Sequence, residues 1–164
     1  MDRDFLKDKR ILVVDDEPDV LESLKELLSR CHVHTASSFE EAKAKIESEF
    51  FDIAVLDIMG VDGFNLLEIA TQRGILSVML TAHALSPETT MDSFKKGAAY
   101  YIPKEKMDQI ETYLNDILEA REKGKPFWWR WLDRFGSYYD KKFGMDWKEK
   151  DKDFWESLKY YDRI

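Results

Sequence analysis

The sequence is poor in cysteine, proline and glycine and has no long apolar run. It has one cysteine, four prolines and seven glycines in 164 residues. Cys31 alone cannot form an internal disulfide, and it has no companion for a cysteine metal cluster. A membrane helix needs about 20 consecutive apolar residues, and the first residues lack the basic region and apolar core of a signal peptide. We therefore expect a cytoplasmic protein without a membrane span.

Basic residues are fewer than acidic ones. The chain has 25 basic and 33 acidic residues, a net charge of -8, which argues against broad nucleic-acid binding because that association depends on neutralising phosphates. The hydrophobic content of 44% and the aromatic content of 13% are sufficient for a core. Residues 121–164 carry 12 basic and 9 acidic residues and all five tryptophans. This change in composition predicts two parts, residues 1–122 and residues 123–164.

The first part alternates between apolar runs and helical patterns. Five short apolar runs, at residues 10–14, 33–36, 53–57, 77–81 and 100–104, are typical of strands, and the segments between and after them have the spacing of amphipathic helices. Alternation of this kind predicts an α/β fold with a five-stranded, parallel, doubly wound sheet. Helices in residues 123–164 would form a C-terminal extension.

Chemically active side chains follow several of these strands. Asp15 and Asp16 follow the first, Asp57 ends the third, Thr81 ends the fourth, and Lys104 ends the fifth. The carboxyl ends of parallel strands meet at one edge, which is where open α/β sheets bind ligands. Clustered carboxylates repel one another unless they share a hard cation such as Mg2+. A carboxylate beside such a cation, a lysine and a hydroxyl indicates a phosphoryl acceptor.

The ordered set resembles the receiver domain of two-component response regulators, a flavodoxin-like fold, over about residues 8–122. The resemblance implies that Asp57 is the phosphoacceptor and that a sensor histidine kinase is the donor. It implies that Asp16, Asp57 and the main-chain carbonyl of Met59 hold Mg2+, with Asp15 supporting it. It also implies that Lys104, Thr81 and Ala82 contact the phosphoryl group, and that rotation of Tyr101 reports the movement of Thr81.

Among the departures from the family pattern, two lie next to the predicted site residues. The run from Asp57 to Gly63 gives a shorter loop after the acceptor, which would displace the Met59 carbonyl. Glu105 follows Lys104 where the family generally has proline, often with a cis bond, and a cis bond before a non-proline residue costs about 2.5 to 4 kcal/mol.

Two flanking residues bear on the lifetime of the phosphoryl group. Met59 cannot hydrogen-bond an attacking water, whereas His83 could, although a solvent-facing loop is the simpler interpretation of His83. We therefore expect slow loss of the phosphoryl group.

Residues 123–164 form an aromatic-rich segment, named here the tail. Aromatic residues recur about every three or four positions from Phe127 to Phe143, which predicts an aromatic helical face, interrupted at Gly136 and stopped at Gly144; residues 154–161 predict a second helix. The 39 residues from 126 to 164 cannot form a large core of their own. The tail would pack on the first part or on a second subunit, or offer Trp128, Trp129, Trp131 and Phe135 as a partner or dimer surface. The nine acidic residues of the segment 121–164 make membrane binding the weaker idea, and the tail has no helix-turn-helix pattern.

The leading hypothesis is a response regulator that switches protein association through Thr81, Tyr101 and the last helix of the first part. Such a protein is not an enzyme in the ordinary sense, although it assists its own phosphorylation. One alternative is a phosphatase or phosphotransferase resembling haloacid dehalogenases, with Asp15 as the nucleophile. Such enzymes have an Asp-x-Asp pattern, but Glu17 stands two residues after Asp15. A flavodoxin-like cofactor binder is a further alternative, but the acids at 15–17 would repel the cofactor phosphate.

Overall fold

The computed structural model of the chain describes residues 4–161. Five parallel strands form one sheet in the spatial order β2-β1-β3-β4-β5. The strands are β1 (Arg10–Val14), β2 (His32–Ala36), β3 (Ile53–Asp57), β4 (Leu76–Thr81) and β5 (Tyr100–Pro103). The central strand β3 is buried along its whole length, as its uninterrupted apolar run predicts for a strand covered on both faces. The predicted fold is therefore confirmed.

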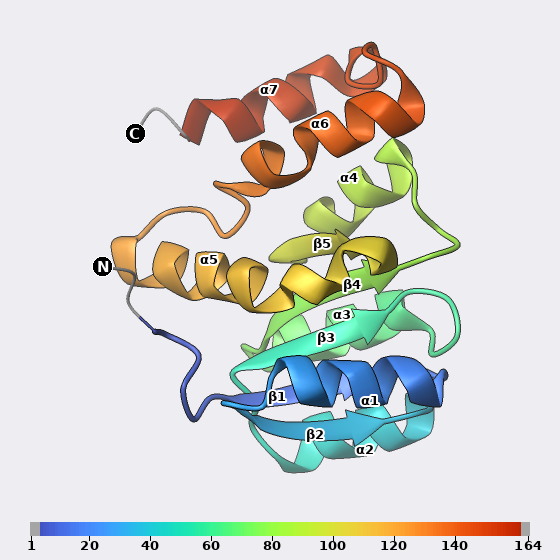
Figure 1. The fold of residues 1–164 in the computed structure, drawn as a ribbon, viewed down its shortest axis with the longest axis vertical. Coiled ribbons are helices and arrows are strands. Elements are labelled where there is room, and N and C mark those ends of the chain that lie inside the picture. The colour runs from blue at the N-terminus through green and yellow to red at the C-terminus, as the bar shows by residue number, and fades with distance from the viewer. Residues whose placement is uncertain (1–3, 162–164) are drawn as a thin grey trace.

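Helices cover both faces of the sheet. Figure 1 shows α1 (Pro18–Leu27) and α5 (Ile110–Lys123) on the near face and α2 (Phe39–Ser48), α3 (Gly63–Gln72) and α4 (Pro87–Lys95) on the far face. Ser38 and Ser86 cap α2 and α4, because their side-chain oxygens accept hydrogen bonds from the amides of Glu41 and Thr89. Strand β5 ends sooner than predicted, since a 3-10 helix, η1 (Lys104–Gln109), lies between it and α5.

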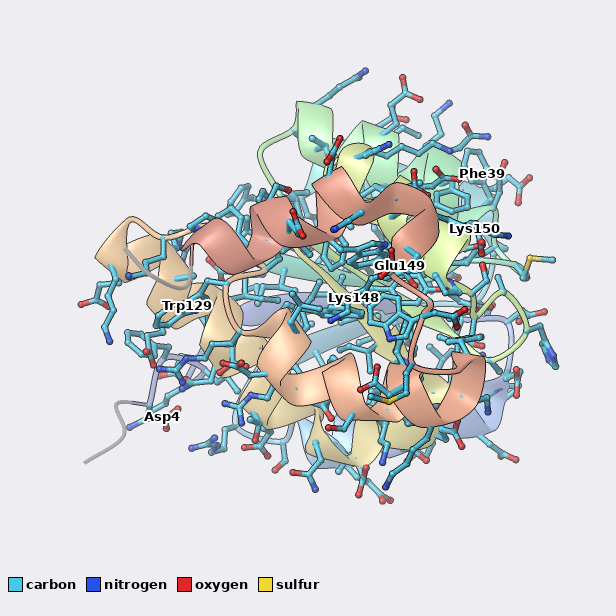
Figure 2. All side chains as sticks on the ribbon, turned by 90° about the horizontal axis from the view of Figure 1, so that it is seen from above. Asp4, Phe39, Trp129, Lys148, Glu149 and Lys150 are labelled. Carbon is cyan, nitrogen blue, oxygen red and sulfur yellow. The ribbon has the colours of Figure 1, made fainter. Side chains whose placement is uncertain are left out.

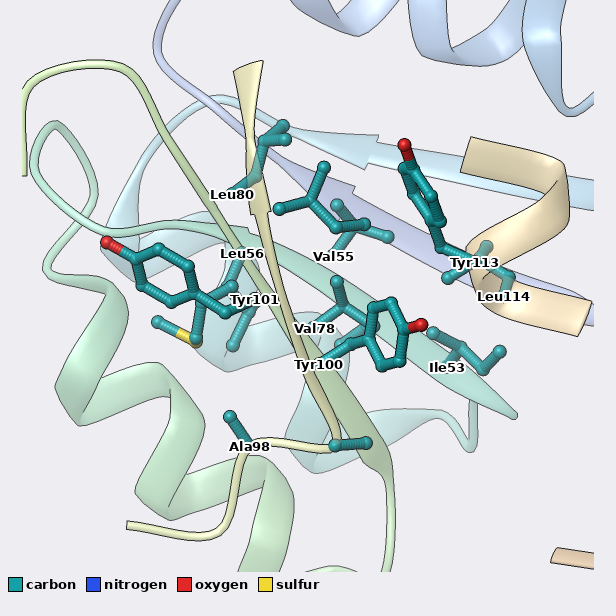
Figure 3. Packing of buried hydrophobic residues seen from close by; sticks show 14 of the residues in the cluster. Ile53, Val55, Leu56, Val78, Leu80, Ala98, Tyr100, Tyr101, Tyr113 and Leu114 are labelled. Atoms are coloured by element: carbon teal, nitrogen blue, oxygen red, sulfur yellow. The ribbon is translucent and has the colours of Figure 1, made fainter. Parts of the chain in front are cut away.

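The core lies between the sheet and these helices. The two tyrosines that begin β5 point to opposite sides of the strand, as alternation along a strand requires (Figure 3). Tyr100 faces α5, where its hydroxyl donates to Asp116 at 3.0 Å. Tyr101 faces the other side, and its hydroxyl donates to the carbonyl of Ala84 at 3.0 Å. Strand β5 therefore connects the two helical layers.

The tail forms α6 (Trp131–Phe143), a 3-10 helix η2 (Glu149–Asp151) and α7 (Lys152–Tyr161). Both α6 and α7 lie beyond β5, at the top of Figure 1. Figure 2 shows the two helices side by side over the rest of the molecule, with Lys148, Glu149 and Lys150 in the connection between them. The tail therefore packs on the α/β part of its own chain, one of the arrangements that the sequence left open.

Helix α6 runs through Gly136 without a break, so the predicted interruption is wrong. Phe135 and Tyr139 on either side of this glycine are both buried, and their packing offsets the cost of about 1 kcal/mol that glycine imposes on a helix interior. The helix ends before Gly144, as predicted, and this residue has a positive φ of 88°. No helix among residues 4–161 is long and apolar enough to cross a membrane.

Candidate phosphoryl-acceptor site

The predicted site residues from β1, β3 and β5 come together at the carboxyl edge of the sheet. Asp57 ends β3, and the neighbouring strand β1 delivers Asp15 beside it. Both residues are buried, with 5% and 0% of their surface exposed. Lys104, which follows β5, lies with its Nζ 2.9 Å from Asp15 Oδ2 and 3.5 Å from Asp57 Oδ1. The Lys104 ammonium therefore forms ion pairs with both buried carboxylates.

Glu17 also reaches Lys104, with 3.0 Å between Nζ and Oε1. Glu17 was not predicted from the sequence to act at the site. Its place in an acidic run just before a helix was the available signal, but such residues also favour the first turn of a helix without any ligand. Asp16 lies on the exposed side of the cluster. Carboxylate oxygens of Asp15, Asp16 and Glu17 lie within 4.8 Å of one another.

The short loop after Asp57 is held by close backbone packing. A Cβ atom at Gly60 would lie 2.3 Å from the carboxyl group of Asp16, and one at Gly63 would lie 2.2 Å from the carbonyl oxygen of Asp57. The Gly60 amide also donates to Asp57 Oδ2 at 3.3 Å. The two glycines thus allow a loop of this length to close against the acids, and the side chain of Met59 is left 63% exposed.

The hydroxyl of Thr81 lies at the end of β4, next to the same edge. Thr81 is buried, and its Oγ1 accepts a hydrogen bond from the Ala84 amide at 3.0 Å. Ala84 also accepts the Tyr101 hydroxyl bond through its carbonyl. Thr81 and Tyr101 are therefore joined through one residue of the loop between β4 and α4. Ala82 and His83 are exposed on this loop.

Burial and mutual repulsion govern the protonation of the acids. Burial, reinforced by the charge of Asp15, raises the pKa of Asp57 above its ordinary value, and Lys104 opposes this shift. Burial likewise raises the pKa of Asp15. For Lys104, burial acts to lower the pKa, but contacts with Asp15 and Glu17 outweigh it and raise the pKa. The site therefore holds more negative charge than its lysine neutralises.

The donor set fits a hard divalent cation. Asp15 Oδ2 is buried, and the Lys104 ammonium lies 2.9 Å from it. The neighbouring groups of Asp16, Asp57 and Glu17 offer oxygen ligands, the kind that Mg2+ prefers. The peptide bond between Lys104 and Glu105 is trans, as are the other peptide bonds of residues 4–161. The segment after β5 thus brings Lys104 to the acids with a trans bond, so the cis bond that is common in the family is not present here.

The tail covers the edge of the sheet next to this site. In α6 the buried Trp131 donates from Nε1 to the carbonyl of Tyr101 at 2.8 Å, so α6 covers edge strand β5 and satisfies one of its carbonyl groups. The Tyr139 hydroxyl lies 2.6 Å from Thr90 Oγ1 on α4. Arg134 donates to both carboxylate oxygens of Asp116 on α5, at 2.9 and 3.0 Å. Helix α6 thus contacts α4, β5 and α5.

Of the four tail residues predicted for a partner surface, two are buried within the chain. Trp131 and Phe135 are 0% and 1% exposed, because Trp131 packs on Phe94, and Phe135 packs on Tyr100. Trp128 and Trp129 are partly exposed before α6. The Trp129 ring lies 4.5 Å from the guanidinium of Arg130. In this conformation the aromatic face of α6 is an internal contact.

Comparison with known proteins identifies the family to which the chain belongs. The family model described as the response regulator receiver domain matches residues 11–115. The chain belongs to this family. Receiver domains are signalling modules, and the match gives no support to the alternative of a phosphatase resembling haloacid dehalogenases. The match ends before the tail, so the family does not account for α6 and α7.

Relatives come from plants, bacteria and archaea. The two-component response regulator ARR18 of Arabidopsis thaliana is 37% identical over 101 residues, which cover 58% of this chain and 16% of that protein. The alginate biosynthesis transcriptional regulatory protein AlgB of Pseudomonas aeruginosa is 33% identical over 125 residues, which cover 71% of this chain and 27% of that protein. This chain thus spans only a small part of the length of these curated relatives.

Solved receiver structures are matched over nearly their full length. The CheY-like receiver domain protein of Methanospirillum hungatei JF-1 has a TM-score of 0.65 and 35% identity, and the match covers 72% of this chain and 99% of that one. A receiver domain from Clostridium thermocellum has a TM-score of 0.61 and 26% identity, over 70% of this chain and 97% of that one. The receiver part is therefore of ordinary size, and the tail is additional.

Proposed function

We propose that this chain accepts a phosphoryl group on Asp57 from a sensor histidine kinase and passes the signal to its own tail. The observation that supports the acceptor role most directly is the position of Lys104, whose ammonium contacts both Asp15 and Asp57 in a buried site. We propose further that residues 1–122 act as the signalling domain, that residues 123–164 act as the output extension, and that the protein works in the cytoplasm.

In the proposed reaction a carboxylate oxygen of Asp57 attacks the phosphorus of a phosphohistidine. A bond forms between phosphorus and this oxygen while the bond between phosphorus and nitrogen breaks. The electron pair returns to the imidazole nitrogen, which takes up a proton from solvent. Asp57 must be ionised to attack, and Lys104 favours that form, while Lys104 and Thr81 would stabilise charge on the transferring oxygens.

Four groups would hold Mg2+ in this proposal: the carboxylates of Asp16 and Asp57, the carbonyl of Met59, and Asp15, which would support it through water. When bound, the ion supplies positive charge that offsets the repulsion between the acids and the incoming phosphoryl group. Gly60 supports this arrangement, because its bare backbone leaves room for the Asp16 carboxyl group. Glu17 competes for Lys104 and would hold the ammonium at the rim of the site before phosphorylation.

The signal would travel through contacts that already link Thr81 to the tail. A movement of Thr81 toward the phosphoryl group would alter its bond with the Ala84 amide, and Ala84 also holds the hydroxyl of Tyr101. The carbonyl of Tyr101 in turn binds Trp131 of α6. The proposed output is a change in how α6 sits on α4, β5 and α5, which would alter binding of a protein target at the tail.

The acceptor role can be tested with acetyl phosphate and Mg2+, with intact mass as the readout. The wild-type chain is expected to gain one phosphoryl group, and Asp57→Asn is expected to gain none. Asp92→Asn, which removes an exposed carboxylate on α4, serves as the matched control and should be phosphorylated like the wild type. Equal phosphorylation of wild type and Asp57→Asn would exclude Asp57 as the acceptor.

The route to the tail needs a separate measurement. Hydrogen exchange of α6 amides is compared with and without beryllium fluoride, which mimics the phosphoryl group, in the presence of Mg2+. Exchange in α6 should change with the mimic, because α6 binds the backbone of Tyr101, and the change should be absent in Asp57→Asn. If α6 exchanges identically in both conditions while the site binds the mimic, the tail is a passive cover of β5.

A further inference from the structure

A pocket of about 350 Å³ lies between the acceptor site and the tail. Its lining residues are Thr81, Ala82, Leu85, Pro103, Lys104, Glu105 and Lys142. Two of them, Thr81 and Lys104, belong to the proposed phosphoryl-binding set, and the last comes from α6. The tail therefore supplies part of the wall of a pocket that opens beside the acceptor site.

Lys142 is held at this pocket by the packing of α6. It lies three residues after Tyr139, about one helical turn, and the Tyr139 hydroxyl bonds to the buried Thr90 at 2.6 Å. Thr90 Oγ1 also bonds to the carbonyl of Ser86 at 2.6 Å. A threonine hydroxyl has a single proton, and if Thr90 gives it to Ser86, the proton of Tyr139 points to Thr90. This buried pair fixes the last turn of α6 against α4.

The Lys142 ammonium forms an exposed ion pair with the first turn of η1. Its Nζ lies 3.2 Å from Oε1 of Glu105, the residue directly after Lys104. The side chains of Lys142 and Glu105 are 49% and 55% exposed, and ion pairs at such positions contribute little energy. The pair orients the ammonium at the rim of the pocket while leaving it able to attract another anion.

We propose that Lys142 is a positioning residue for the phosphodonor, supplied to the receiver site by the tail. This inference rests on the proposed phosphoryl transfer to Asp57. A phosphodonor entering the pocket carries negative charge into a site that already holds several carboxylates, and Lys142 offsets part of that repulsion at the entrance. Glu105 stands where the family generally has proline. Its negative charge lies beside the Lys142 ammonium and weakens the attraction between Lys142 and the phosphodonor.

The transfer step itself is unchanged by Lys142. With acetyl phosphate as donor, a bond forms between an Asp57 oxygen and phosphorus, and the bond between phosphorus and the acyl oxygen breaks. Acetate leaves with the electron pair, and no proton is transferred. Lys142 is expected to affect capture of the dianionic donor, and hence the concentration that gives half the limiting rate, while leaving the limiting rate near that of the wild type.

The test compares Lys142→Gln with Lys141→Gln in the full chain, with acetyl phosphate and Mg2+ at low salt. Lys141 is the neighbouring exposed lysine, so its loss removes the same charge at a position that does not line the pocket. Lys142→Gln should lower the second-order rate constant about fivefold, as expected for one partly screened charge, and the difference should shrink as salt is added. Lys141→Gln should behave like the wild type.

Two further variants complete the test. Lys142→Arg keeps the charge and should retain the wild-type rate constant. Glu105→Gln frees the ammonium and should raise the rate constant in the otherwise wild-type chain, but not when it is combined with Lys142→Gln. The proposal is wrong if the Lys142 and Lys141 variants have the same rate constant, or if the loss in Lys142→Gln is insensitive to salt. Failure of the proposed function itself would look different, since the wild type would then gain no phosphoryl group at all.

Discussion

At the residue scale, the carboxyl edge of the sheet brings side chains from separate strands into contact, as when Lys104 meets Asp15 and Asp57. Strand-ending acids, a hydroxyl and a lysine are visible in a sequence because each follows an apolar run. The role of Gly60 is not visible, because it depends on the Asp16 carboxyl group, 44 positions earlier in the chain, which would lie 2.3 Å from a Cβ atom at residue 60. Lys142 was missed for the same reason, since its partner Glu105 is 37 positions away.

Gly60→Ala tests the close approach between the loop and Asp16. The new methyl group would occupy the place of the Asp16 carboxyl group, which must rotate away. Loss of an orienting contact at a metal site typically lowers affinity about 10- to 100-fold, and we expect Mg2+ binding to weaken by about tenfold, measured by titration calorimetry. Gly136→Ala makes the same chemical change in α6, far from the acids, and should leave Mg2+ affinity unchanged. Unaltered Mg2+ affinity in Gly60→Ala would show that Asp16 is not placed by this contact.

At the scale of elements, periodicity placed the strands and most helices of the receiver domain, and it failed where tertiary packing outweighs local preference. Gly136 looked like a break because glycine is a poor helix former, but aromatic contacts on both sides keep α6 continuous. The residues of the 3-10 helix η1 were assigned from the sequence partly to the predicted strand and partly to the helix after it. Aromatic spacing predicted that α6 has an apolar face, but the surface that the face covers depends on the fold.

Gly136→Ala should stabilise the chain. No atom outside the helix backbone lies within 4 Å of a Cβ built at this position, so the methyl group fits, and alanine avoids the entropy that glycine loses in a helix. We expect a gain of about 0.5 to 1 kcal/mol in the free energy of unfolding and a rise of about 1 to 4 °C in Tm, measured by calorimetry. Gly124→Ala should do the opposite, because the φ of Gly124 is 68° and alanine is strained there. A lower Tm for Gly136→Ala would mean that α6 is distorted at this residue.

For the whole molecule, the tail occupies the surface formed by α4, β5 and α5. Trp131 satisfies a carbonyl of the edge strand, and Arg134 pairs with Asp116, whose side chain is 4% exposed. A second subunit could reach this surface only after these contacts are broken, which would leave the buried Asp116 carboxylate without its closest guanidinium partner. Because the tail is docked on its own chain in this way, we expect the protein to be a monomer, while the homodimer and the protein target suggested by the sequence both stay predictions.

We therefore predict a monomer by light scattering, both with Mg2+ alone and with Mg2+ and beryllium fluoride. Arg134→Gln should behave differently, since it leaves Asp116 buried without its strongest partner and loosens α6. The aromatic face of α6 would then be exposed part of the time, and the average mass should rise with protein concentration. Arg73→Gln, an exposed arginine at the end of α3, is the control and should remain monomeric. A wild-type mass that doubles with beryllium fluoride would contradict the prediction, because phosphorylation would then open a self-association surface that the docked tail is expected to keep closed.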